Sequence, residues 1–229
     1  VIDVYHKKVM AQKNFINHAL YVTLFPQLVA GPIVRYRDIS KQIYQRIISS
    51  QKFYSGILRF CTGLMKKILI ANPMAIIADT AFNNPIIELS SAEAWLGIIA
   101  YSLQIYFDFS GYSDMAIGLG RMLGFDFLEN FNYPYMSKSI QEFWRIWHIS
   151  LSSWFRDYVF IPLGGSRGSS FEVIRNIGFV FLLTGIWHGA NWTFLFWGAY
   201  HGVFVLIEKL GWARILAKLP KFIQHLYLC

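Results

Sequence analysis

Apolar residues are grouped in this sequence into blocks as long as a membrane-spanning helix. The clearest blocks run from about residue 94 to 119 and from about residue 174 to 210. Because about 20 apolar residues cross the hydrocarbon core of a bilayer as an α-helix, the second block is long enough to cross twice. The composition agrees, since 55% of the 229 residues are hydrophobic and only 15% are charged, whereas soluble domains carry about 25% charged residues. We therefore expect an integral membrane protein and exclude a disordered chain.

The other apolar blocks contain helix breakers or charges, which predicts helices that do not cross the bilayer in a straight line. The block from about 15 to 34 contains Pro26 and a Gly-Pro pair, and the block from about 53 to 82 is divided into two shorter halves by two lysines and Pro73. Residues 133–163 mix aromatic residues with charges, as in a helix at the membrane interface or along a cavity. We predict an all-α, multi-pass integral membrane protein with kinked, re-entrant and interfacial helices.

The formal net charge of +8 is by itself compatible with a protein that binds nucleic acid. The basic residues, however, form short clusters between the apolar blocks, at residues 6–13, 35–41, 66–67 and 209–221. Such clusters mark the cytoplasmic ends of spanning helices or contacts with anionic lipid headgroups. We therefore expect membrane lipid, and no nucleic acid, as a partner.

His188 is the first candidate for chemistry, because an ionisable residue at membrane depth is costly and marks a functional site or an internal pair. It lies at a break in the last apolar block, after Trp187 and before a Gly-Ala-Asn sequence and Trp192. A neutral imidazole in this apolar setting can accept a hydroxyl proton, as a general base for acyl transfer to an alcohol must. A buried histidine that serves only packing fits the position equally well.

His148 is the second candidate and lies in the segment that mixes aromatic and charged residues. On a continuous helix it would share a face with Trp144 and Ser152, where it could orient a substrate or stabilise an oxyanion. A structural histidine that pairs with Glu142 or with a backbone carbonyl group fits the spacing equally well.

Two carboxylates, Asp108 and Asp114, also lie at membrane depth. They are six residues apart and do not share a helical face, although a helix broken near Gly111 would bring both to one cavity. We favour a structural role for them, in capping or hydrogen bonding, over direct catalysis. No residues near His188 have the spacing of metal ligands, and we expect no metal.

Four segments of the sequence form a pattern specific enough to point to one family. They are residues 24–35, the Tyr-Phe-Asp-Phe-Ser-Gly-Tyr-Ser-Asp-Met-Ala string at 106–116, residues 142–163 and the Trp-His-Gly string at 187–189. Together they resemble the membrane-bound O-acyltransferases, and most of all the alginate O-acetyltransferase branch. Members of that family are longer, so the resemblance implies that 1–229 is a partial membrane domain, with N-terminal spans and a C-terminal end outside it.

The resemblance implies that His188 is catalytic and that His148 is a second histidine of the site. It also implies a tunnel through the bacterial cytoplasmic (inner) membrane, which the protein would span several times. The co-substrate would be acetyl-CoA or another acyl thioester on the cytoplasmic side, with no bound cofactor. The acetyl group would reach an extracytoplasmic polysaccharide such as alginate, with a periplasmic or extracellular acetyltransferase as partner. The candidates for lining the tunnel are Trp144, Trp147, Trp187, Asn191, Trp192, Asp108 and Asp114.

We therefore predict a membrane O-acyltransferase in which His188 deprotonates the acceptor hydroxyl and His148 positions a reactant or polarises the carbonyl group. Transfer of a D-alanyl group to teichoic acid is the nearest alternative. A polysaccharide or lipid transporter, from a different class, would use Asp108, Asp114 and His188 as a proton relay. The last alternative is an inactive scaffold that binds partners.

Overall fold

The computed structural model of the protein describes residues 1–28, 31–85 and 89–228, and these residues form helices and connecting segments without a β-strand. The all-α prediction is therefore confirmed for the described chain. Two helical segments, Ser50–Asn83 and Ser170–His188, are long and apolar enough to cross a membrane. The chain divides into two compact units, residues 1–129 and residues 130–229.

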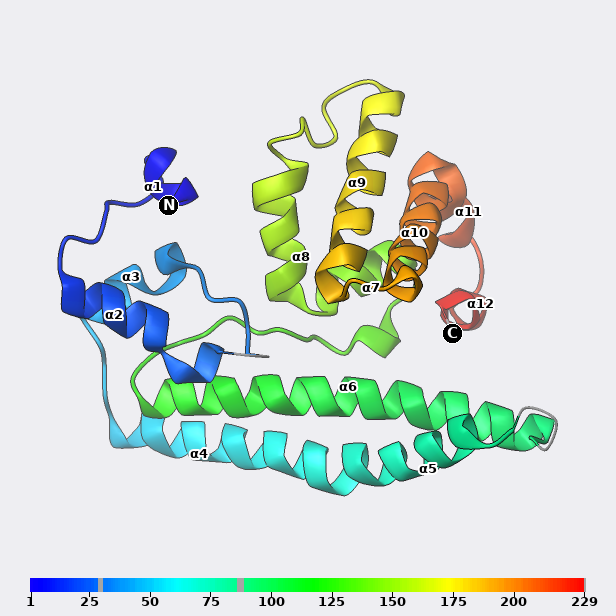
Figure 1. The fold of residues 1–229 in the computed structure, drawn as a ribbon, viewed down its shortest axis with the longest axis horizontal. Coiled ribbons are helices and arrows are strands. Elements are labelled where there is room, and N and C mark those ends of the chain that lie inside the picture. The colour runs from blue at the N-terminus through cyan, green and yellow to red at the C-terminus, as the bar shows by residue number, and fades with distance from the viewer. Residues whose placement is uncertain (29–30, 86–88, 229) are drawn as a thin grey trace. The chain divides into compact units, whose positions relative to one another are not determined.

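The first unit contains short N-terminal helices and a long antiparallel pair, in which α6 runs back along α4 and α5 (Figure 1). Helix starts follow the local sequence. The Asn14 side chain accepts a hydrogen bond from the Ile16 N–H, and Ser90 with Glu93 forms a capping box at the start of α6. The helices are α1 (Ile2–Tyr5), α2 (Phe15–Thr23), α3 (Tyr36–Tyr44), α4 (Ser50–Met65), α5 (Asn72–Asn83) and α6 (Ser91–Met122).

The helix break predicted in the apolar block at residues 15–34 is confirmed. Helix α2 ends at Thr23, and Pro26 lies in a short 3₁₀ turn, Phe25–Gln27. Proline lacks the N–H that a continuing helix needs, so the chain leaves the helix there. Val29 and Ala30 of this block lie outside the described residues.

The apolar block at residues 53–82 was expected to be divided into two halves. This expectation is wrong, because α4 and α5 are joined into one helical segment. The connection is a π-helical turn, Lys66–Ala71. The ring of Pro73 would clash with the carbonyl group four residues earlier in a regular α-helix, and that residue, Leu69, lies within the π turn. The helix broken near Gly111 is not observed either, since α6 continues through that residue.

Glycines bring α4 and α6 into backbone contact. A Cβ atom at Gly56 would lie 2.7 Å from the Gly118 carbonyl oxygen, and one at Gly118 would lie 2.6 Å from the Gly56 carbonyl oxygen. Gly63 and Gly111 approach each other in the same way farther along the pair. Small residues permit such approach between apolar helices, where dispersion contacts replace the hydrophobic effect as the source of stability.

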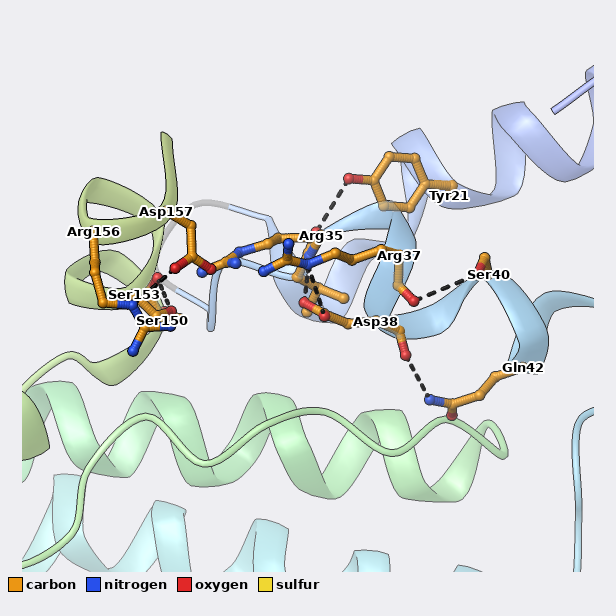
Figure 2. Close-up of polar contacts among 11 residues, drawn as sticks. Tyr21, Arg35, Arg37, Asp38, Ser40, Gln42, Ser150, Ser153, Arg156 and Asp157 are labelled. Carbon is orange, nitrogen blue, oxygen red and sulfur yellow. Dashed lines mark hydrogen bonds and ion pairs between the residues drawn. The ribbon is translucent and has the colours of Figure 1, made fainter. Parts of the chain in front are cut away.

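Beside this pair, α3 packs a small apolar core in which Ile39 is fully buried. At the edge of this core, the Gln42 side chain forms hydrogen bonds with the backbone. The Gln42 side chain accepts a hydrogen bond from the Asp126 N–H at 2.7 Å, and its amide donates to the Asp38 carbonyl oxygen. Figure 2 shows this Gln42 contact and the Ser40 hydroxyl donating to the Arg37 carbonyl oxygen.

The second unit is built from shorter helices, and the interfacial segment predicted at 133–163 is divided. It contains α7 and α8, separated at Trp147 and His148, followed by a π turn, Arg156–Phe160. The break predicted at residues 189–191 is confirmed, because one helix ends at His188 and the next begins at Trp192. The helices are α7 (Ile140–Ile146), α8 (Ile149–Phe155), α9 (Ser170–His188), α10 (Trp192–Ile207), α11 (Ala213–Leu216) and α12 (Lys221–Leu228) (Figure 1).

Two Gly→Ala substitutions, one at the contact between α4 and α6 and one away from it, should change the stability of the protein in opposite directions. Gly56→Ala should lower the stability by about 1–3 kcal/mol, because the new methyl group overpacks the Gly118 backbone. Gly178→Ala, within α9, meets no atom within 4 Å and should stabilise by about 0.5–1 kcal/mol through helix propensity. Thermal unfolding of the full-length protein in detergent measures both. An unchanged melting temperature for Gly56→Ala would contradict the close packing.

Candidate functional site

His188 is the last residue of α9, and its ring is oriented by its own helix. The Nδ1 atom lies 2.8 Å from the Thr184 carbonyl oxygen. A carbonyl oxygen only accepts hydrogen bonds, so Nδ1 carries the proton and Nε2 presents a lone pair. The ring packs against the indole of Trp197, with centroids 4.6 Å apart, and against Trp187 at 5.0 Å. His188 therefore has the tautomer that a general base requires.

The environment of His188 differs from the one expected. The sequence argument relied on an apolar, desolvated setting, whereas His188 is exposed in the described chain, as are Trp187 and Trp192. The Thr184 contact, rather than burial, determines which ring nitrogen carries the proton. The sequence argument missed this contact, although a helical carbonyl group four residues before the histidine was within reach on spacing alone.

His148 is buried and lies where α7 ends and α8 begins. Its backbone has φ +46° and ψ +55°, a left-handed conformation that costs energy in any residue with a Cβ atom. The expectation that His148 shares a helical face with Trp144 and Ser152 is therefore wrong, because the helix does not continue through it. The chain turns at this residue and directs the imidazole towards Asn130.

Asn130 holds His148 in place. Its Oδ1 atom lies 3.0 Å from His148 Nδ1 and accepts hydrogen bonds from the Ser150 N–H at 3.1 Å and the Ser150 hydroxyl at 2.8 Å. Because a backbone N–H can only donate, the atom facing it is the amide oxygen, and His148 Nδ1 donates to it. Nε2 of His148 is thereby left with a lone pair. Glu142, which was considered as a partner of His148, accepts a hydrogen bond from the Lys138 N–H at 2.8 Å.

Burial, and secondly the proximity of His188, lowers the pKa of His148 to about 4. The imidazole is therefore neutral at neutral pH. A neutral ring whose Nδ1–H donates a hydrogen bond to Asn130 can accept a hydrogen bond at Nε2 but cannot donate one there. This favours the role of orienting a hydroxyl or thiol group over that of polarising a carbonyl group.

Both histidines line one cavity of about 510 Å³ in the second unit. This volume lies in the range of small-molecule sites, roughly 300–1,000 Å³. Apolar side chains form most of the wall, and three basic side chains also reach it, those of Arg145, Arg156 and Lys209. Arg156 is also paired with the neighbouring Asp157 at 2.8 Å (Figure 2).

The predicted lining residues divide into two groups. Trp144 and Trp147 line the cavity, together with the two histidines. Trp187 instead packs edge-on against His188, Trp192 packs against Phe196 with its ring exposed, and Asn191 caps the first turn of α10. These three are not among the residues that line the cavity. Their part in a longer tunnel stays a prediction.

Asp108 and Asp114 belong to the first unit, where each has a basic partner on the facing helix. Asp114 lies 2.6 Å from both Arg59 and Lys66, and Asp108 lies 2.5 Å from Lys67. The two lysines in the middle of an apolar helix are thereby neutralised, as charges at membrane depth must be. These ion pairs favour the structural role for both carboxylates, and their place along a tunnel stays a prediction.

Asp114→Asn should lower the stability by about 1–3 kcal/mol, because it removes the counter-charge of Lys66 and leaves Arg59 with Glu129 alone. Asp126→Asn is the matched control. Asp126 pairs with Lys52 at 2.7 Å but is mostly exposed, so its loss should cost about 0–1 kcal/mol. Thermal unfolding in detergent compares the two. Similar melting temperatures for both variants would show that the buried pair does not stabilise the helices.

Comparison with known proteins adds an independent observation. The model of the membrane-bound O-acyltransferase family matches residues 7–220. The probable alginate O-acetylase of Azotobacter vinelandii is 53% identical over 226 residues, which are 99% of this chain and 44% of that protein. The peptidoglycan O-acetyltransferase of Helicobacter pylori is 43% identical over 199 residues, 86% of the chain and 38% of that protein.

A more distant relative is the teichoic acid D-alanyltransferase of Bacillus subtilis, which is 34% identical over 195 residues, 80% of the chain and 49% of that protein. The chain thus spans 38–49% of the length of these three relatives.

Proposed function

The chain belongs to the membrane-bound O-acyltransferase family, and from this premise we propose that it forms part of an O-acyltransferase that moves an acetyl group from a cytoplasmic thioester towards hydroxyl groups of an extracytoplasmic polysaccharide such as alginate. The observation that carries the proposal is the pair of imidazoles that line one cavity, each with its Nδ1 proton held by an oxygen acceptor. The alginate and peptidoglycan relatives support a polymer hydroxyl as the acceptor.

In the proposed reaction, His188 Nε2 accepts the proton of the acceptor hydroxyl. The oxygen of that hydroxyl attacks the carbonyl carbon of an acyl thioester. The new carbon–oxygen bond forms, the carbon–sulfur bond breaks, and the imidazolium returns its proton to the leaving thiolate. His148 orients a hydroxyl or thiol group through its Nε2 lone pair. The largely apolar wall of the cavity keeps water from the thioester, which would otherwise be hydrolysed.

The proposed setting is the bacterial cytoplasmic membrane, crossed several times by kinked and re-entrant helices. Acetyl-CoA or another acyl thioester is the proposed donor, reached from the cytoplasmic side, and no resident cofactor is needed. A periplasmic or extracellular acetyltransferase is the proposed partner that completes transfer to the polymer. The helical segments Ser50–Asn83 and Ser170–His188 support spans.

Transfer of a D-alanyl group to teichoic acid is the second candidate function, supported by the 34% identical relative. Both reactions use an acyl thioester and a polymer hydroxyl, and they differ in the acyl group. The transporter alternative is less well supported, because Asp108 and Asp114 are held in ion pairs with basic side chains.

The deciding experiment uses cells that lack the native gene and are complemented with the full-length gene. Acetyl esters and D-alanyl esters on the surface polymers are quantified separately, together with the amount of exported polymer. Restored acetyl esters support the proposal, and restored D-alanyl esters support the second candidate. Normal acetylation of intracellular polymer with failed export in the deletion strain would contradict the acyltransferase proposal in favour of a transporter.

A further inference from the structure

Glu208 is a buried carboxylate at the end of α10 that contacts the start of another helix. It is 1% exposed. Its Oε1 atom accepts a hydrogen bond from the Ile140 N–H at 2.7 Å, and its Oε2 atom accepts one from the Gln141 N–H at 2.9 Å. Ile140 and Gln141 are the first two residues of α7. Both carboxylate oxygens are therefore bound to backbone donors of one helix N-terminus.

These contacts complete the capping of α7. The first N–H groups of a helix have no partner within the helix. Glu208 satisfies the first two, and the Ser139 hydroxyl accepts from the third, the Glu142 N–H, at 3.1 Å. Burial of a carboxylate is costly unless it is bound. Two charge-assisted hydrogen bonds at the positive end of the helix dipole offset that cost.

Helix α7 depends on such contacts, because its seven residues are too few to form a stable helix alone. A second contact from the C-terminal part of the unit holds the segment before it, since the His225 imidazole donates from Nδ1 to the Ser137 carbonyl oxygen at 3.0 Å. The beginning of α7 is thus fixed by Glu208, the first residue of the π turn after α10 (Glu208–Trp212), and by His225 of α12, both far along the chain.

Helix α7 in turn carries part of the cavity wall and leads into His148. Trp144 packs against Trp197 with ring centroids 5.4 Å apart and against His201 at 5.0 Å. Gln141, Trp144 and Arg145 line the cavity. The helix ends at Ile146, two residues before His148 with its left-handed backbone. A shift of α7 would therefore move both the wall and the imidazole.

We propose that Glu208 is a positioning residue of the acyl-transfer site, which clamps the N-terminus of α7 and thereby holds Trp144 and His148 in the cavity. The inference rests on the proposed function for its kinetic consequence, and on the hydrogen bonds alone for its structural one. A displacement of about 1 Å at a reacting group lowers rates on the order of a hundredfold. Loss of the clamp should therefore reduce kcat rather than donor binding.

The test compares Glu208→Ala and Glu208→Gln in the full-length protein in detergent micelles. Hydrogen–deuterium exchange is followed in peptides that cover residues 139–148, and the kcat and KM of acetyl transfer are measured in parallel. We expect Glu208→Ala to accelerate exchange in this segment and to lower kcat on the order of tenfold to a hundredfold, with the KM for the donor nearly unchanged. Glu208→Gln should fall between Glu208→Ala and the wild type, because its amide oxygen keeps one of the two acceptors.

Glu172→Gln is the matched control. Glu172 is an exposed carboxylate that accepts a hydrogen bond from the Ser169 N–H at 2.7 Å, at the start of α9. Its replacement should leave exchange at 139–148 and kcat unchanged. If the Glu172→Gln control is folded and the amide exchange of residues 139–148 in Glu208→Ala is as slow as in the wild type, the clamp is refuted. Faster exchange with an unchanged kcat refutes the positioning role. A wild-type protein that transfers no acetyl group refutes the proposed function, whereas the exchange data still measure the clamp.

Discussion

Replacement of His188 by alanine is expected to abolish acetyl transfer while the protein remains in the membrane. The side chain lines the cavity, and its Nε2 atom is the proposed proton acceptor because Nδ1 is bound to the Thr184 carbonyl oxygen. General-base catalysis contributes on the order of 10² to 10⁴ in rate. We expect a loss of that size in the full-length His188→Ala variant, measured as transfer of labelled acetyl groups in proteoliposomes.

The control for this prediction separates catalysis from folding. His18 is an exposed histidine on α2, and His18→Ala should leave transfer unchanged. Immunoblots of the membrane fraction and thermal unfolding of both variants verify insertion and folding. The ring of His188 packs at the end of α9 against Trp197, so a modest decrease in melting temperature is expected as well. Transfer at the wild-type rate by a stable His188→Ala variant would contradict the assignment of the base.

Asn130→Leu is expected to have the second largest effect. Asn130 is fully buried, and its amide oxygen accepts three hydrogen bonds, from His148 and twice from Ser150. Leucine has a similar volume but accepts none, and each buried donor left without a partner costs about 1–3 kcal/mol. The imidazole of His148 loses the acceptor that holds its Nδ1 proton. We expect a decrease in transfer on the order of a hundredfold, because the imidazole is no longer held in place and a displacement of about 1 Å at a reacting group costs about that factor.

Asn130→Asp gives the conservative counterpart, with an effect that depends on pH. The carboxylate keeps an acceptor for His148 Nδ1, so transfer at about pH 8 should be closer to the wild type than in Asn130→Leu. Its negative charge stabilises the imidazolium form and raises the pKa of His148 from about 4. His148 therefore becomes protonated at a higher pH in the variant, and the variant should lose activity on acidification before the wild type does.

The measurement is the pH–rate profile from about pH 5 to about pH 8 for the wild type and each variant. Asn132→Leu is the matched control, because Asn132 is exposed and its backbone N–H donates to the Ile146 carbonyl oxygen, a bond that the substitution leaves intact. A profile for Asn130→Asp that coincides with that of the wild type would contradict the contact between Asn130 and His148.

Several features of the fold were predictable because they depend on short stretches of sequence. The apolar blocks became helices, Pro26 ended α2, and the break at residues 189–191 separated α9 from α10. The mistaken expectations have a common cause. Proline and paired lysines suggested an interruption at 66–73, but a π turn and ion pairs with α6 let the helical segment continue. A helical face was assumed across His148, where a contact from outside the segment bends the chain.

The sequence by itself determined the all-helical class, the family pattern and the two histidines, because apolar length, helix caps and short motifs are local properties of the chain. Only the tertiary structure decided how His148 and the start of α7 are held. Asn130 meets His148 from 18 residues away, and Glu208 meets α7 from 68 residues away. No periodicity or spacing records such contacts, because a hydrogen bond between distant residues depends on how the intervening helices pack. The tautomer of His148 follows from its contact with Asn130, whereas that of His188 follows from the Thr184 carbonyl group of its own helix.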